Sequence, residues 1–415
     1  MFYTSTIIIC MDNLHSIRIK IFLFIFLFLT ALSTLFVSPV VASNWYLDNS
    51  ATGNNSGTSW ANAWKDASNI NFSVIASGDT LYISGGNISK TYTGMISIPS
   101  GTSGITISGS NESGHNGEII FNGAGATSSG IRINGTGKIV KDLTISDITF
   151  NAYTEAGIYG NGQTSGGMQN ITINSCKFTN FKRSGVFMEG NGNLNNNFNI
   201  VVKNSHFDDD NNFTGQSDGI YVQVLKDFTA DNNTIILDNN YLGVTDLHSD
   251  NIQSFWVDNV TYSNNVVKQS NSKTLGTQML FTENGYGTHI LFNNVFIRDT
   301  PNAEDSAIRL KSTEGLTYTA KVIGNTYYGK GRILNSSVIS EIKNNIFYGL
   351  SQPTTSRPLY ITATGSDVSN NIFYDPDSQF PATDGGVETN PVFRNLDFNN
   401  TDLRLANNSP AIDAG

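Results

Sequence analysis

Cysteine is nearly absent from this chain of 415 residues, which carries only Cys10 and Cys176. Two cysteines cannot build a disulfide framework, so stability must come from packing. Proline is scarce as well, with 9 residues, and charged residues make up only 14%. The 16 Tyr and 25 Phe exclude a disordered chain, because such segments are poor in aromatic residues. We therefore expect a folded protein built from apolar and aromatic strands.

A helical period is also missing beyond the N-terminal region. Apolar residues alternate with a period of two instead, as in Ile171-Thr172-Ile173. This alternation is typical of β-strands, and the 39 Gly supply many turns between them. The composition and the period together predict an all-β body.

One short phrase recurs along the second half of the chain, in which an alternating strand runs into Asn-Asn-x-Phe or a variant of it. Its second position is occupied by Ser205, Asn233, Asn265, Asn294, Asn325, Asn345 and Asn371. The spacing of 20 to 32 residues lies within the range that marks repeat architectures. We predict a solenoid in which each repeat is one coil.

Stacked coils explain why asparagine recurs. Strands paired in parallel lie about 4.8 Å apart, so equivalent side chains of successive coils form columns. A column of asparagines can pass amide hydrogen bonds from coil to coil. Asparagine also tolerates the left-handed backbone of a tight corner.

The N-terminus has the features of an export signal. His15, Arg18 and Lys20 precede the apolar run 21–37, and the small residues before Ser43 are typical of a cleavage site. We expect residues 1–42 to be a signal peptide cleaved after Ala42. An uncleaved membrane anchor is the alternative, and either interpretation places the body outside the cytoplasm.

The remaining chain divides into three parts. Residues 43–78 are expected to cap the solenoid, with a short helix near 64–76 over the first coil. Residues 79–376 are expected to form the coils. Residues 377–415 form a C-terminal extension whose abrupt end is typical of a fragment of a longer protein.

Several segments of the chain resemble those of a known superfamily. The segments are Trp45-Tyr46-Leu47-Asp48-Asn49, Gly57-Thr58-Ser59-Trp60-Ala61-Asn62-Ala63-Trp64, Gly78-Asp79-Thr80-Leu81-Tyr82-Ile83, the Asn-Asn-x-Phe repeats and Ser409-Pro410-Ala411-Ile412-Asp413-Ala414-Gly415. They are similar to those of bacterial secreted right-handed parallel β-helix proteins of the pectate-lyase-like superfamily. The resemblance implies a right-handed single-stranded parallel β-helix and carbohydrate as the default ligand. The net charge of −10 argues against nucleic acid as a partner.

Aligned coils predict one stripe of functional groups. Asp218 and Asp250 are expected to be neighbours one coil apart, followed by Gln278. The adjoining outward column is expected to hold Tyr221, Gln253, Phe281 and Arg309, with Lys311 two residues beyond Arg309 on the same face. His248 lies at the Asp250 corner. We predict Asp218, Asp250, Arg309 and Lys311 as catalytic and Tyr221, His248, Gln253, Gln278 and Phe281 as substrate-binding residues.

Two chemistries fit this stripe. In a glycosidase, repulsion between stacked carboxylates would raise the pKa of one, which could then act as the acid while the other stays ionised. The segments Gln216-Ser217-Asp218-Gly219, Ser249-Asp250, Gly276-Thr277-Gln278 and Arg309-Leu310-Lys311 resemble polygalacturonases, although Ser249 and Thr277 replace an acid and a histidine of that pattern. In a lyase, Lys311 or Arg309 would take the proton beside a uronate carboxylate.

Calcium is a further possibility for the lyase, with Asp218, Asp250 or the run 208–210 as ligands, but the sequence singles out no metal residue. The alternative function is a non-catalytic adhesin or carbohydrate-binding protein. Asp-Gly at a coil corner is ordinary turn chemistry, so Asp218 also has a purely structural interpretation.

Overall fold

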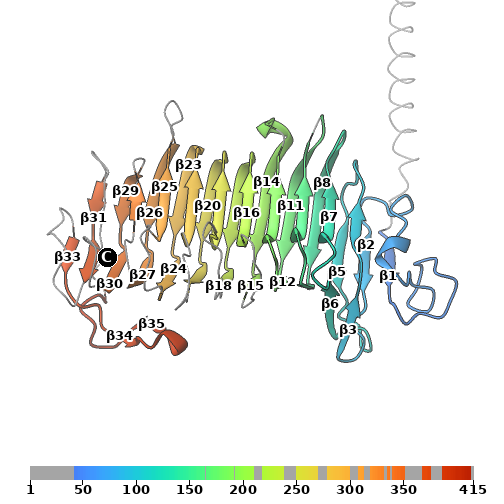
Figure 1. The fold of residues 1–415 in the computed structure, drawn as a ribbon, viewed down its shortest axis with the longest axis horizontal. Coiled ribbons are helices and arrows are strands. Elements are labelled where there is room, and N and C mark those ends of the chain that lie inside the picture. The colour runs from blue at the N-terminus through green and yellow to red at the C-terminus, as the bar shows by residue number, and fades with distance from the viewer. Residues whose placement is uncertain are drawn as a thin grey trace, which may run out of the picture. The chain divides into compact units, whose positions relative to one another are not determined.

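A computed structural model describes residues 42–163, 165–190, 192–209, 217–237, 249–269, 278–299, 307–312, 318–330, 334–336, 339–350, 367–374 and 386–412. Within them, three long parallel sheets run the length of the coil stack (Figure 1). The chain visits the sheets in turn, so β11, β12 and β13 make one coil before β14 returns to the first sheet. The fold is the predicted all-β right-handed parallel β-helix.

The three sheets contain twelve, twelve and nine strands in the described part of the chain. The first sheet comprises β1 (Asn44–Leu47), β2 (Thr80–Ile83), β5 (Thr106–Gly109), β8 (Ile139–Ser146), β11 (Gly167–Asn174), β14 (Asn197–Lys203), β17 (Lys226–Asp231), β20 (Asp258–Ser263), β23 (Tyr286–Phe292), β26 (Tyr318–Ile323), β29 (Ile339–Lys343) and β31 (Asp367–Ser369). The second sheet comprises β3 (Ser89–Tyr92), β6 (Glu118–Asn122), β9 (Thr149–Asn151), β12 (Lys177–Thr179), β15 (His206–Asp209), β18 (Thr234–Leu237), β21 (Val266–Gln269), β24 (Val295–Arg298), β27 (Thr326–Lys330), β30 (Ile346–Leu350), β32 (Asn371–Tyr374) and β33 (Gly386–Glu388). The third sheet comprises β4 (Ile96–Ile98), β7 (Ser129–Asn134), β10 (Ala156–Asn161), β13 (Ser184–Glu189), β16 (Asp218–Gln223), β19 (Ile252–Phe255), β22 (Leu280–Glu283), β25 (Ile308–Lys311) and β28 (Leu334–Ser336).

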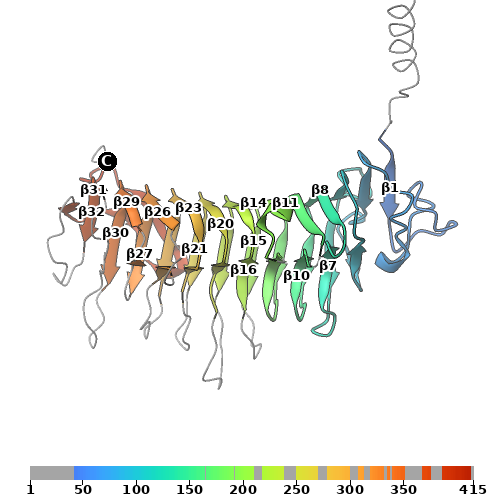
Figure 2. The ribbon, with the colours of Figure 1, turned by 90° about the horizontal axis from the view of Figure 1, so that it is seen from above.

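Figures 1 and 2 show the strands of successive coils lying side by side. Three single 3₁₀ turns accompany them, η1 (Ala67–Asn69), η2 (Leu194–Asn196) and η3 (Phe398–Asn400). No helix in the described ranges is long and apolar enough to cross a membrane. The predicted signal peptide lies outside these ranges except for Ala42 and stays a prediction.

The Asn-Asn phrase turns each corner between the first and second sheets. Its first asparagine has a positive φ, between 52° and 58° at positions 204, 232, 264, 293, 344 and 370. Its second asparagine points inward and is buried, as at Asn265 and Asn294. The Nδ2 group of Asn265 donates to Oδ1 of Asn294 at 2.9 Å, and Asn294 donates likewise to Asn325. Both predicted roles of asparagine are therefore confirmed. The first asparagine of the phrase adopts the left-handed backbone of the corner, and the second forms the hydrogen-bonded column.

Aromatic rings fill the core against the second sheet. Phe150, Phe178 and Phe207 stack with centroids 5.3 and 4.6 Å apart. A Cβ atom on Gly185, in the third sheet, would lie 2.5 Å from the Phe207 ring. Real Cβ atoms do not approach so closely. Glycine is therefore required at this position of the third sheet, where the strand packs against these rings.

The segment 43–78 differs from its prediction in one respect. In place of a helix over 64–76 it has the single turn η1, while β1 joins the first sheet beside β2. Trp64 is buried and stacks on Trp45 at 5.5 Å. Asn, Gly and Ser residues around these rings favour turns over a longer helix.

After β32 the second sheet gains one more strand, β33. The antiparallel pair β34 (Phe393–Asn395) and β35 (Asp402–Leu405) follows. These strands pack their apolar side chains on Ile297, Tyr328 and Tyr348 at the outer side of the second sheet. The C-terminal extension thus covers an apolar surface of the last coils.

Candidate functional site

The outer face of the third sheet carries a continuous column of functional side chains. Strand pairing aligns Arg132, Tyr159, Phe187, Tyr221, Gln253, Phe281 and Arg309, which we call the outer column. Its last four members are the outward column that the sequence predicts. The strands that carry it, β7 to β25, are adjacent in the stack (Figure 1).

Alternation along each strand turns these side chains outward. In β16, Ile220 and Val222 are fully buried in the core, and Tyr221 lies between them on the opposite face. Tyr159 and Phe187, which are 9% and 1% exposed, form a buried apolar cluster separate from the core, with Tyr221 packed against it. Phe281 is 4% exposed, so the predicted exposure of its ring is wrong, and of the four rings in this column only Tyr221 is more than 9% exposed. The Phe187 and Tyr221 rings are stacked at 4.9 Å and 2°.

Arginines lie over the rings of this column. Arg132 is 5.2 Å from the Tyr159 centroid, Arg183 is 4.4 Å from Phe187, and Arg309 is 5.5 Å from Phe281. Arg183 also forms an ion pair with Glu155. The face therefore combines apolar rings with guanidinium groups, the donor that best matches a carboxylate.

A second column runs beside the first, two residues further along each strand. It consists of Asn161, Glu189, Gln223, Phe255, Glu283 and Lys311, which we call the rim column. Lys311 donates to Glu283 at 2.5 Å. The predicted position of Lys311 on the face of Arg309 is thus observed, in an ion pair with the neighbouring coil.

Tyrosine hydroxyls connect the two columns. Tyr159 donates to Glu189 at 2.9 Å, and Tyr221 donates to Gln223 at 2.9 Å. Burial raises the pKa of Tyr159 to about 12, and the hydrogen bond to Glu189 adds to the effect. Burial, followed by the charge of Asp218, also raises the pKa of Tyr221 to about 12. Both hydroxyls therefore stay protonated and act as hydrogen-bond donors.

Asp218, Asp250 and Gln278 do form a column, but it is buried. Their exposed fractions are 6%, 0% and 0%. Oδ1 of Asp218 accepts the backbone N–H of Asp250 at 2.8 Å, and Oδ1 of Asp250 accepts that of Gln278 at 2.8 Å. The expected surface position of these three residues is wrong. Asp218 lies two residues before the core residue Ile220, so both side chains point to the inner face of the strand. The geometry supports the alternative interpretation, in which the carboxylates cap coil corners.

The predicted repulsion between the two carboxylates has a counterpart in the structure. Burial, then the charge of Asp250, raises the pKa of Asp218 well above its usual range, although the N–H of Asp250 and the charge of Arg183 oppose this. Such a place favours the protonated, uncharged form of the carboxyl group. It would need access to a substrate before it could act as an acid.

The remaining predicted site residues are placed as follows. Gln253 is half-buried in the outer column, and His248 lies outside the described residues. Of the acidic run 208–210, Asp209 accepts a hydrogen bond from Ser217 at 2.9 Å, and residue 210 is not described. No group of three or more metal-binding side chains occurs in the described ranges.

Sequence reasoning did not single out Tyr159, Phe187, Glu189 and Glu283. A signal for the aromatic pair was present, because Ala156-Gly157-Ile158-Tyr159 and Ser184-Gly185-Val186-Phe187 repeat the phrase of Asp218-Gly219-Ile220-Tyr221. The glutamates lie at strand ends, where alternation alone does not separate a face from a corner.

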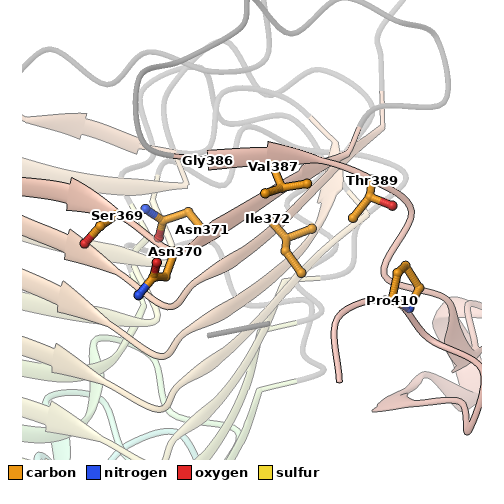
Figure 3. Close-up of a pocket in the computed structure, with 8 residues that line it drawn as sticks. All are labelled: Ser369, Asn370, Asn371, Ile372, Gly386, Val387, Thr389 and Pro410. Atoms are coloured by element: carbon orange, nitrogen blue, oxygen red, sulfur yellow. The ribbon is translucent and has the colours of Figure 1, made fainter. Parts of the chain in front are cut away.

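Outside this face, a hollow of about 320 Å³ lies where the coils meet the C-terminal segment. Figure 3 shows Ile372, Val387 and Pro410 among its lining residues, with Asn370 and Asn371 at one side. None of its described lining residues has a titratable side chain.

Comparisons with known proteins support the fold. No protein-family model and no curated protein matches the chain. Among solved structures, pectate lyase Pel9A is 14% identical with a TM-score of 0.52, over 90% of this chain and 91% of that chain. A rhamnogalacturonan lyase is 13% identical with a TM-score of 0.41, over 80% and 87% of the two chains. A polygalacturonase from Erwinia carotovora ssp. carotovora is 12% identical with a TM-score of 0.43, over 85% and 98%. At these identities the likeness concerns the fold, and function must be argued from the site.

Proposed function

We propose that this is an exported protein that binds a uronate-containing or related polysaccharide along the outer column. The observation that carries the proposal is the outer column, in which Tyr221 and Gln253 are half-buried and arginines lie over the buried rings of Tyr159, Phe187 and Phe281. Aromatic faces stack on the apolar C–H faces of sugar rings, and guanidinium groups bind carboxylates through two parallel hydrogen bonds. Coils recur about every 4.8 Å, so one column offers repeated contacts to a repeating polymer.

Cleavage by β-elimination fits the site better than hydrolysis. A glycosidase needs two accessible carboxyl groups roughly 5–9.5 Å apart, and the expected pair, Asp218 and Asp250, is buried with backbone N–H groups bound. A lyase needs a cation to hold the uronate and a basic group beside it. Arg309 would hold the carboxylate, and Lys311 in its neutral form would take the proton from the carbon beside it as the neighbouring glycosidic C–O bond breaks. Calcium would assist by neutralising the uronate, and its need stays part of the proposal.

A non-catalytic binder is the second candidate. It is favoured by the same buried capping role of Asp218 and Asp250 and by the ion pair that engages Lys311. A binding surface needs only the outer column, whereas a lyase also needs a deprotonated Lys311. The two functions therefore share one surface and differ in turnover.

The decisive experiment offers residues 43–415 to pectin, polygalacturonate, alginate, chondroitin and xylan, with and without calcium. New reducing ends with absorbance from unsaturated uronate would establish a lyase, and new ends without it a hydrolase. Binding without new ends would establish the binder. If no polymer is bound or cleaved, the proposal is overturned.

Substitution of Arg309 ties the result to this site. Arg309→Gln is expected to weaken binding of a uronate polymer about 10- to 100-fold, since a hydrogen bond to a charged group contributes about 1.5–3 kcal/mol. Lys203→Gln is the matched control, because it removes one positive charge from the first sheet. Equal losses in both variants would show non-specific attraction in place of a site.

A further inference from the structure

Trp256 occupies a backbone conformation that its side chain does not favour. It lies at the corner between β19 and β20 with φ of 56°. Twelve of the 21 described non-glycine residues with positive φ are asparagines, and Trp256 is the only aromatic one. Bulky side chains are uncommon in the left-handed region, where Asn and Gly are suited. The fold alone gives no reason for tryptophan here.

The neighbouring coils show what this corner normally accepts. Val224 donates its N–H to the Phe255 carbonyl, Trp256 to that of Glu283, and Asn284 to that of Lys311. The three residues thus occupy one corner column, with φ between 54° and 57°. Asn284 meets the corner's preference, so an asparagine at 256 would serve the backbone better than tryptophan.

Trp256 is also exposed and sits in an aromatic group. Its side chain is 40% exposed. Its ring lies 5.9 Å from that of Phe255, at the end of the third sheet, and 6.4 Å from that of Tyr286, at the start of the first. Phe255 belongs to the rim column and pairs with Glu283, which holds Lys311. An aromatic surface therefore continues from the proposed site around the corner.

We infer that Trp256, with Phe255 and Tyr286, is an aromatic subsite that stacks on a sugar ring of the polysaccharide bound along the outer column. This inference rests on the proposed function and assigns it a residue that determines affinity. The occupant is a sugar, because the group is small, bordered by the charged pair Glu283 and Lys311, and continuous with the outer column. The exposed ring and the unfavourable backbone have one explanation, since the side chain is kept for binding at a cost in local stability.

This explanation predicts opposite effects of one substitution on stability and binding. Trp256→Asn is expected to keep or raise the melting temperature and to weaken polymer binding about tenfold. Val224→Asn makes the same backbone change one coil earlier without removing an aromatic ring. It is expected to keep or raise the melting temperature and to leave binding unchanged.

The measurement is affinity electrophoresis in gels containing the polymer that the unchanged protein binds, alongside thermal unfolding of each variant. Polymer should also shield Trp256 from acrylamide quenching, and that shielding should vanish in Trp256→Asn, since the other three tryptophans lie at positions 45, 60 and 64. Equal binding by Trp256→Asn and the unchanged protein overturns the inference and leaves the proposed function standing. A lower melting temperature together with weaker binding would show a structural role instead. If the unchanged protein binds no polymer, both proposals fail.

Discussion

The carboxyl group of Asp218 is buried away from water and accepts one backbone hydrogen bond. Its protonation state should therefore affect the free energy of unfolding. Its pKa is raised in the folded protein, so the folded state binds the proton more tightly than the unfolded state. Stability from this group is then complete below the unfolded pKa, near 3.8, and is lost as pH rises through the folded pKa. At neutral pH the residue therefore stabilises the folded protein less than it does in acid.

Asp218→Asn should consequently stabilise the protein at pH 7 and leave it unchanged below about pH 4. The amide oxygen can still accept the N–H of Asp250, whereas Asp218→Ala leaves that buried donor unsatisfied and should cost about 1–3 kcal/mol. Urea unfolding at several pH values measures both. Abolished polymer cleavage in a stable Asp218→Asn variant with intact binding would instead restore a catalytic role for this residue.

His289 makes folding stability depend on pH in the opposite direction. It is fully buried beside Tyr318, and burial lowers its pKa to about 4. Since the unfolded value is 6.5, stability is full above pH 6.5 and falls by roughly 3 kcal/mol as pH falls towards 4. A His289→Phe variant should lose this slope in urea titrations between pH 7 and 4. An unchanged slope would assign it to other groups.

Among the elements, the inner asparagine column is the one most sensitive to single changes. Oδ1 of Asn294 accepts both the backbone N–H and the Nδ2 group of Asn265. Asn294→Ala leaves the buried backbone N–H of Asn265 without this partner and removes one of the two acceptors of its Nδ2 group, and a buried unsatisfied donor costs about 1–3 kcal/mol. Asn293→Gly, one residue earlier, keeps the positive φ and should be nearly neutral.

Hydrogen exchange would locate this damage. Because coils contact mainly their neighbours, protection in Asn294→Ala should fall first in β21, β24 and β27. Uniform loss of protection along all coils would mean that the solenoid unfolds as one unit and would contradict the prediction.

The elements also show how far sequence reasoning reaches. Coil register followed from the repeated phrase, since a shift of one residue would turn Ile220 outward and Tyr221 inward. The same alternation places Asp218 on the inner face of its strand. The sequence nevertheless suggested a surface site, because several polar residues lie close together at the neighbouring corner. Burial at a corner depends on what packs over it, and alternation does not encode that. The backbone conformation of Trp256 could not be predicted either, because its corner is recognisable only from the asparagine one coil later.

For the molecule as a whole, the C-terminal segment matters to solubility. Phe398 stacks on Tyr328 at 4.9 Å, and Tyr328 donates to the Leu396 carbonyl. Removal of residues 390–415 should expose Ile297, Tyr328 and Tyr348, increase binding of a hydrophobic dye and promote aggregation. Phe398→Ala should show a smaller effect, about 1 kcal/mol, because only part of that side chain is buried. Dye binding equal to that of the full chain would show that the segment is dispensable.

The inner asparagines, finally, give the coil stack a direction. From Asn233 to Asn345, the Nδ2 group of each asparagine donates to Oδ1 of the asparagine in the following coil, and the last acceptor is Asn371. Five consecutive hydrogen bonds of one sense polarise each other, as do the peptide groups along a helix. The stack is thus an electric dipole buried in an apolar core, positive towards its later coils. Reversing a single amide would set two like poles against each other, so the column can lengthen by whole coils but does not tolerate a flipped one.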